Sequence, residues 1–162
     1  MVIADNVSEV FGRIEDAASR ALREPSDVKL VAVTKTVEVA SIEEVIEAGV
    51  TCIGENRVQE AERKFTEDLP PVEKHLVGHL QRNKVRKALP LFDMIQSVDS
   101  VRLAREISTQ CAAASTVAEA LVEVNTSGEE TKFGLEPGEG VEHGARPTGK
   151  VAGMGGTCRS VG

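Results

Sequence analysis

The sequence contains no tryptophan and no tyrosine, and its aromatic residues are four phenylalanines. Proteins that bind single-stranded nucleic acid stack bases on aromatic side chains, and this chain has few that could serve. Its net charge of -7 also argues against a general nucleic-acid binder, because phosphate contacts require a basic surface. We therefore expect no nucleic-acid partner. The missing tyrosine further excludes any mechanism in which tyrosine is the acid or the base.

Cysteine and long apolar runs are also scarce. Cys52, Cys111 and Cys158 are far apart and form no CxxC pair, so neither a disulfide framework nor a zinc site is indicated. No apolar run approaches the ~18 residues that cross a bilayer. Residues 1–10 lack the basic start and apolar centre of a signal peptide. These features favour a cytoplasmic protein with no membrane partner.

The chain has 162 residues, enough for one domain with a substantial core. Apolar runs alternate with helical patterns, which favours an α/β fold with a parallel sheet and right-handed crossovers. A barrel and an open doubly wound sheet both fit this alternation. Ser41 and Glu44 form a capping box, Gly49 ends that helix, and Ser100 caps the last one. The expected helices are 5–23, 42–48, 56–65, 83–89 and one from 100, and the expected strands are 29–34, 51–55, 75–79, 94–98 and 120–125.

Polar side chains gather where the expected strands end. A lysine in this position often only extends its amine to solvent. In a parallel barrel, however, the carboxyl ends of the strands carry the chemistry, which favours a functional role for Lys35. The polar residues at these ends are Lys35, Glu55, Asn56, His79, Gln81, Ser97, Asp99, Asn125 and Thr126.

Two other patterns resemble sites. His75 and His79 have the spacing that binds a metal on a helix. On a strand they are roughly 13 Å apart, too far to share one ion, so we expect no metal site. The basic run from 82 to 87 is typical of a solvated helix face, with an anion or protein contact as the alternative.

Five motifs in order resemble the pyridoxal-phosphate homeostasis protein family, whose members are single-domain barrels related to the N-terminal domain of alanine racemase. The resemblance covers roughly residues 5–140. The motifs are "LVAVTKT" (30–36), "IGENRVQE" (53–60), "HLVGHLQRNK" (75–84), "MIQSVDS" (94–100) and "VEVNTSGEETKFGLEP" (122–137).

The resemblance implies a function and a cofactor. In that family the lysine that matches Lys35 forms a Schiff base with pyridoxal 5'-phosphate (PLP). Asn56 and the loop with His79 would line the cofactor pocket. The family role is PLP homeostasis without established turnover, so the resemblance implies no catalytic residue, and it adds PLP-dependent client enzymes as partners.

The chemistry of an imine agrees with this assignment. An imine requires a neutral amine, and burial favours the neutral form of lysine. If Lys35 points into the barrel, the alternation of a strand places Val31 and Val33 inward and Thr34 toward the helices. We therefore expect an apolar layer beneath Lys35 that desolvates its amine.

The chain departs from the family pattern toward its C-terminus. Ten of its 14 glycines fall from Gly128 on, and we divide the chain into a partial PLP-binding barrel (1–140) and a glycine-rich tail (141–162). The family barrel has eight strands, and this chain is expected to supply about five or six of them. Five lie within residues 1–140, and a degenerate sixth would follow at 150–154. The segments 153–156 and 159–162 resemble the family's phosphate-binding turns only faintly. This pattern suggests a truncated or altered C-terminus.

Two rival functions remain open. Alanine racemases place a lysine and a tyrosine on opposite faces of PLP and have a second domain, and this chain has no tyrosine. The other rival is a truncated fragment without a competent site. The oligomeric state also stays open.

Overall fold

The computed structural model describes residues 3–128 and 133–136. The expected sixth strand at 150–154 and the turns at 153–156 and 159–162 lie outside these residues. Two short 3-10 turns, Pro25–Asp27 and Arg82–Lys84, precede β1 and α4. The helices are α1 (Ile3–Arg20), α2 (Val39–Glu47), α3 (Val58–Lys64), α4 (Val85–Ala88) and α5 (Val101–Ala114), and the strands are β1 (Ala32–Val33), β2 (Cys52–Glu55), β3 (Glu73–Leu76), β4 (Met94–Val98) and β5 (Glu119–Val122).

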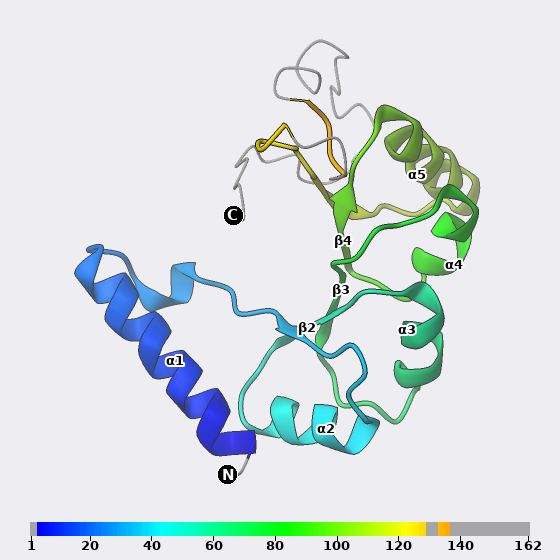
Figure 1. The fold of residues 1–162 in the computed structure, drawn as a ribbon. Helices are drawn as coiled ribbons and strands as arrows, with labels where there is room; N and C mark the ends of the chain where they lie inside the picture. Colours follow the sequence, from blue (N-terminus) through cyan, green and yellow to red (C-terminus); the bar gives the residue numbers. More distant parts are fainter. Residues whose placement is uncertain (1–2, 129–132, 137–162) are drawn as a thin grey trace.

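The described residues form a five-stranded parallel sheet in the order β1-β2-β3-β4-β5. In Figure 1, α2, α3, α4 and α5 follow one another along the outer side of this curved sheet. Beyond β5, Leu135 forms an isolated parallel bridge with Val124. The expected parallel α/β architecture is confirmed, and it is a partial barrel.

The core lies between the sheet and its helices. Every second residue of a strand faces the same side, and most buried helix-facing positions are apolar, with Thr34 and Glu55 as polar exceptions. Ile53, Leu76 and Ile95 are at most 1% exposed. One cluster packs α3, α4 and α5 against β3 and β4, and a second packs α1 and α2 against β1 and β2. None of the described helices has the length and apolar character needed to cross a membrane.

Several element boundaries differ from the sequence-based expectations. β1 has two paired residues instead of the six expected at 29–34. α2 begins at Val39, so Ser41 lies inside the helix, and its N-cap is Glu38 without a side-chain hydrogen bond. β3 ends at Leu76, which places His79 in the following loop.

Two expected helix boundaries are confirmed. Gly49 has φ of +100°, a conformation that favours glycine, and it follows the end of α2. Ser100 caps α5, because its Oγ accepts a hydrogen bond of 3.3 Å from the Leu103 N–H.

Gly78 brings the loops after β2 and β3 into direct contact. A Cβ added to Gly78 would overlap the backbone carbonyl of Asn56 and lie 2.8 Å from its Cα. Backbone atoms cannot move aside as the end of a flexible side chain can. Only glycine therefore allows the chain after β3 to lie against the chain after β2.

We predict that Gly78→Ala lowers the free energy of unfolding by about 1–3 kcal/mol, the usual cost of overpacking. Urea-induced unfolding measures this change. Gly12→Ala is the matched control, since a Cβ there meets nothing within 4 Å and Gly12 lies inside α1. Gly12→Ala should raise the free energy of unfolding by roughly 0.5–1 kcal/mol, because glycine destabilises the interior of a helix relative to alanine. Equal stability of Gly78→Ala and wild type would contradict the packing described.

Candidate functional site

The three residues expected to bind the cofactor lie at one edge of the sheet. Lys35 follows β1, Asn56 follows β2 and His79 lies in the loop after β3. The strands are neighbours and parallel, so their carboxyl ends meet at this edge. Backbone hydrogen bonds continue past the strands, from Thr34 N to Gly54 O (2.8 Å) and from Val77 N to Glu55 O (2.9 Å). The packing of Asn56 on Gly78 brings the second and third positions together.

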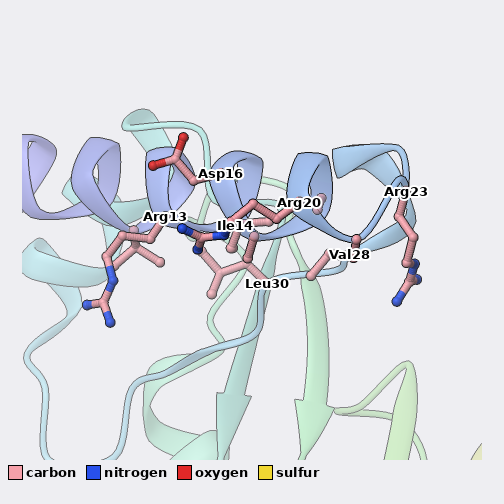
Figure 2. A pocket seen from close by; sticks show the side chains of 11 residues that line it. Arg13, Ile14, Asp16, Arg20, Arg23, Val28 and Leu30 are labelled. Atoms are coloured by element: carbon pink, nitrogen blue, oxygen red, sulfur yellow. The ribbon is translucent and has the colours of Figure 1, made fainter.

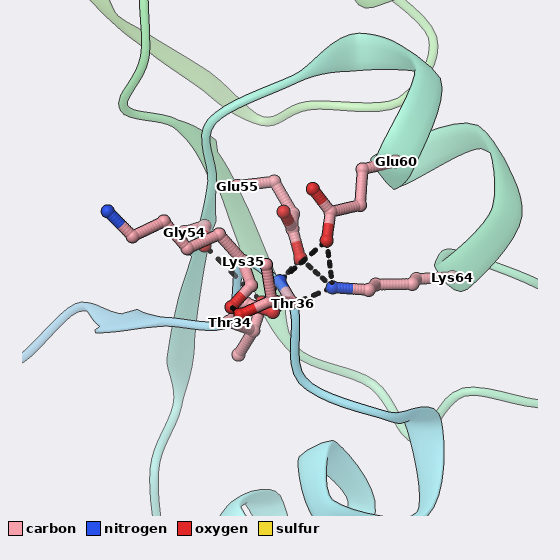
Figure 3. Close-up of polar contacts among 7 residues, drawn as sticks. All are labelled: Thr34, Lys35, Thr36, Gly54, Glu55, Glu60 and Lys64. Carbon is pink, nitrogen blue, oxygen red and sulfur yellow. Dashed lines mark hydrogen bonds and ion pairs between the residues drawn. The ribbon is translucent and has the colours of Figure 1, made fainter.

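Lys35 points away from the helices, as expected from the alternation along β1. Figure 3 shows its side chain on the opposite side from Glu55 and Lys64. Thr34 is buried and faces the helices. The expected desolvation of Lys35 is wrong, however, because Lys35 is exposed and the inward-facing Val33 is 48% exposed. In a closed barrel the opposite strands cover this inner face, and the described residues supply five strands.

On the helix side, a buried ion-pair network surrounds the end of β1 (Figure 3). Lys64 on α3 donates to Thr34 O (2.7 Å), to Glu55 Oε1 (2.8 Å) and to Glu60 Oε1 (2.8 Å). The same Oε1 atom of Glu60 accepts a 2.6 Å hydrogen bond from the Thr36 N–H. The end of β1 is therefore bound by side chains from both β2 and α3.

The hydrogen bonds in this network stabilise the ionised forms of Lys64 and Glu60. The Lys64 side chain is 11% exposed and that of Glu55 is fully buried. Burial alone would lower the pKa of Lys64, but its hydrogen bonds to Glu55 and Glu60 outweigh burial and raise that pKa. The hydrogen bond from Lys64, followed by that from the Thr36 N–H, lowers the pKa of Glu60. Lys64 is thus held as a cation.

Sequence reasoning missed this network, although two signals pointed to it. Glu60 and Lys64 are four residues apart, the spacing at which opposite charges pair on a helix. The second signal is Glu55, the last residue of β2, which precedes Asn56 of the candidate edge. It has the same parity as Ile53, however, so its side chain faces α3.

The loop that carries His79 is held from two sides. His79 Nδ1 lies 2.8 Å from Asp99 Oδ2, just after β4. The Phe133 ring stacks on the His79 ring with 4.3 Å between centroids. Ser97 Oγ donates a 2.7 Å hydrogen bond to Gly78 O. These contacts keep His79 at the carboxyl edge of the sheet.

A second polar cluster lies at the opposite end of the strands. Ligand atoms of Cys52, Glu73 and His75 lie within 4.8 Å of one another, as in a metal site. Lys29 Nζ contacts both Glu73 oxygens at 2.9 and 2.6 Å, and Gln96 Nε2 is 2.7 Å from His75 Nδ1. Burial raises the pKa of Cys52 to about 11, which disfavours the thiolate that binds metals. Glu73 and His75 of this cluster are bonded to each other and to Lys29 and Gln96.

A cavity of about 690 Å³ runs along α1 (Figure 2). Its walls come from α1 and from the segment that leads to β1, including Arg13, Arg20 and Leu30. None of the three expected cofactor-binding residues lines it. The candidate site is therefore the carboxyl edge of the sheet rather than this cavity.

The chain matches a known protein family over most of its length. Residues 11–152 match the family model described as "Alanine racemase, N-terminal domain". Among curated proteins, the chain is 39% identical over 137 residues to the pyridoxal phosphate homeostasis protein of Pseudomonas aeruginosa. It is 40% identical over 139 residues to that of Aquifex aeolicus. These alignments cover 83% and 85% of this chain but 59% and 60% of the relatives, so the chain spans about three fifths of their length.

Solved structures agree with the sequence comparisons. An unknown protein from Bifidobacterium adolescentis is 40% identical with a TM-score of 0.78, over 86% of this chain and 61% of that one. PipY of Synechococcus elongatus, solved with PLP bound, is 39% identical with a TM-score of 0.64. The match covers 76% of this chain and 58% of PipY. An alanine racemase of Clostridium difficile is 16% identical with a TM-score of 0.64. It shares the fold over 84% of this chain and 34% of its own. The chain therefore belongs to the family of the alanine racemase N-terminal domain, and its curated relatives in these comparisons are pyridoxal phosphate homeostasis proteins.

Proposed function

We propose that this protein binds PLP through a Schiff base on Lys35 and holds the coenzyme for release instead of turning over a substrate. The observation that carries the proposal is the position of Lys35. It is an exposed amine at the carboxyl edge of the sheet, in a chain 39% identical to a protein solved with PLP bound. We place this function in the cytoplasm, where the buried thiols of Cys52 and Cys111 stay reduced.

The residues at the edge fit the chemistry of an aldehyde. Lys35 would hold the coenzyme through its amine, which would condense with the aldehyde and release the aldehyde oxygen as water. When bound, PLP supplies an electron-withdrawing ring conjugated with the bond so formed. The inner face beside Lys35 is open, as the 48% exposure of Val33 indicates, so an aldehyde can reach the amine.

Two neighbours would orient the bound ring. The half-buried Asn56 offers an amide beside Lys35 on the next strand end. The stacked rings of His79 and Phe133 offer a flat surface one strand further along. The segments proposed for the phosphate, 153–156 and 159–162, lie outside the described residues. We further propose PLP-dependent client enzymes as the recipients of the coenzyme.

A racemase is the second candidate, because the fold is shared with alanine racemases. That likeness, at 16% identity, concerns the fold alone. A two-base racemization with a lysine and a tyrosine is not available to a chain without tyrosine. Coenzyme binding therefore accounts better for the residues at this edge.

We predict that borohydride reduction of the PLP-loaded protein places the adduct on Lys35, as read by peptide mass mapping. Lys35→Ala should abolish the adduct, because Lys64, the other described lysine near the end of β1, is buried and bound to two carboxylates. Lys84→Ala serves as the control and should retain it. An adduct on Lys84 or Lys132, or an undiminished adduct in Lys35→Ala, would contradict the assignment.

We also predict no racemase activity. Alanine or serine incubated with the protein and PLP in deuterated buffer should exchange its α-proton no faster than with free PLP, because the protein is proposed to hold the coenzyme without turning over an amino acid. Proton NMR of the amino acid measures this exchange. Saturable exchange that disappears in Lys35→Ala would instead support the racemase.

A further inference from the structure

We propose that Glu60 and Lys64 of α3 are positioning residues that set the direction of Lys35 and so determine how readily it forms a Schiff base. This inference rests on the proposed function, because it concerns the same lysine. It assigns a role to two side chains that touch neither Lys35 nor the space beside it. Their contacts are with the backbone on both sides of Lys35.

The geometry of these contacts carries the inference. The peptide group before Lys35 contains Thr34 O, which accepts from Lys64 Nζ at 2.7 Å. The peptide group after Lys35 contains the Thr36 N–H, which donates to Glu60 Oε1 at 2.6 Å. Lys64 and Glu60 are themselves paired at 2.8 Å. One ion pair thus contacts both peptide planes that flank Lys35, and these planes determine where its Cα–Cβ bond points. The Val37 N–H also donates to Thr34 O at 3.0 Å.

The backbone at Thr36 requires such support. Its φ is +62°, and a β-branched residue rarely adopts this left-handed region. Strained residues of this kind persist only where surrounding contacts hold them, and they gather at functional sites. The hydrogen bond to Glu60 is the contact that holds the Thr36 N–H in this conformation.

The network also distinguishes the two lysines nearest the end of β1. Lys64 is buried, faces the helices and is bound to two carboxylates, so its amine is not free to react. Lys35 is exposed and points to the opposite side (Figure 3). The buried charge of Lys64 therefore supports the backbone from behind while the amine of Lys35 stays accessible.

Three variants test this role. Glu60→Ala removes the acceptor for the Thr36 N–H, and Glu60→Gln retains an oxygen at the same place. The double variant Glu55→Gln with Lys64→Met removes the side-chain bond to Thr34 O and leaves the backbone bond from the Val37 N–H. It does so without leaving the carboxylate of Glu55 buried and unpaired. Glu62→Ala is the matched control. Glu62 lies on the same helix and pairs with Lys87 at 3.0 Å, with neither residue bonded to β1.

The measurements are the equilibrium of imine formation with PLP, followed by absorbance, and the hydrogen exchange rate of the Thr36 amide without PLP. We expect Glu60→Ala and the double variant to weaken imine formation about tenfold, in line with the cost of misplacing a reacting group. Exchange at Thr36 should accelerate by a similar factor in Glu60→Ala. Glu60→Gln should recover most of both properties, and Glu62→Ala should match wild type.

The outcomes separate this inference from the proposed function. If wild type forms no adduct on Lys35, the proposed function fails, and with it the positioning role. If wild type forms the adduct and Glu60→Ala forms it equally well, only the positioning role is overturned. A loss in Glu60→Ala that is equalled in Glu62→Ala, or that Glu60→Gln does not reduce, would also overturn it. Thermal unfolding of each variant identifies any change that follows from lost stability alone.

Discussion

The buried ammonium group of Lys64 is the interaction on which the candidate site depends. Within the described residues, β1 is two residues long and pairs with β2 alone, so its own ladder holds it weakly. Lys64 donates one hydrogen bond to the carbonyl of Thr34, just beyond β1, and another to Glu55 at the end of β2. It therefore links the ends of the two strands. Removing one partner of such a pair commonly costs about 3–5 kcal/mol, because the other charge stays buried. The end of β1 is therefore placed by electrostatics as much as by strand pairing.

The two faces of the sheet differ in chemistry, and this difference suits a reactive lysine. The helix side is an apolar core in which the buried charges of Glu55 and Lys64 are paired, while Glu55 Oε2 has no hydrogen-bond partner. The inner side carries polar groups that satisfy one another, as Lys29, Glu73 and His75 do. The hydrogen bond from Lys29 lowers the pKa of Glu73, so this pairing persists to lower pH than the ordinary pKa of a glutamate would allow. The inner side thus carries a paired polar cluster at the amino end of the strands and the exposed Lys35 at their carboxyl end.

The edge that holds Lys35 is assembled from the segments that follow β1, β2, β3, β4 and β5. Gly78 lets the loop after β3 lie on Asn56, and Asp99 and Phe133 then hold His79 beside it. Each contact joins residues from different strands, so the edge forms only when the sheet does. The family assignment agrees with this arrangement, since the PLP-bound PipY structure aligns over 76% of the chain.

The sequence by itself determined the order of elements and the edge at which the polar residues gather. Alternating apolar runs and helical patterns indicate parallel strands, and the carboxyl ends of parallel strands must share an edge. The sequence pattern therefore places Lys35, Asn56 and His79 among the polar residues at this edge, and the family resemblance selects these three. The tertiary structure decided the short β1, the early start of α2 and the exposure of Lys35. It also decided that Glu55 and Lys64 meet behind the strand. These features depend on contacts between segments distant in sequence, whose energies local propensity does not contain.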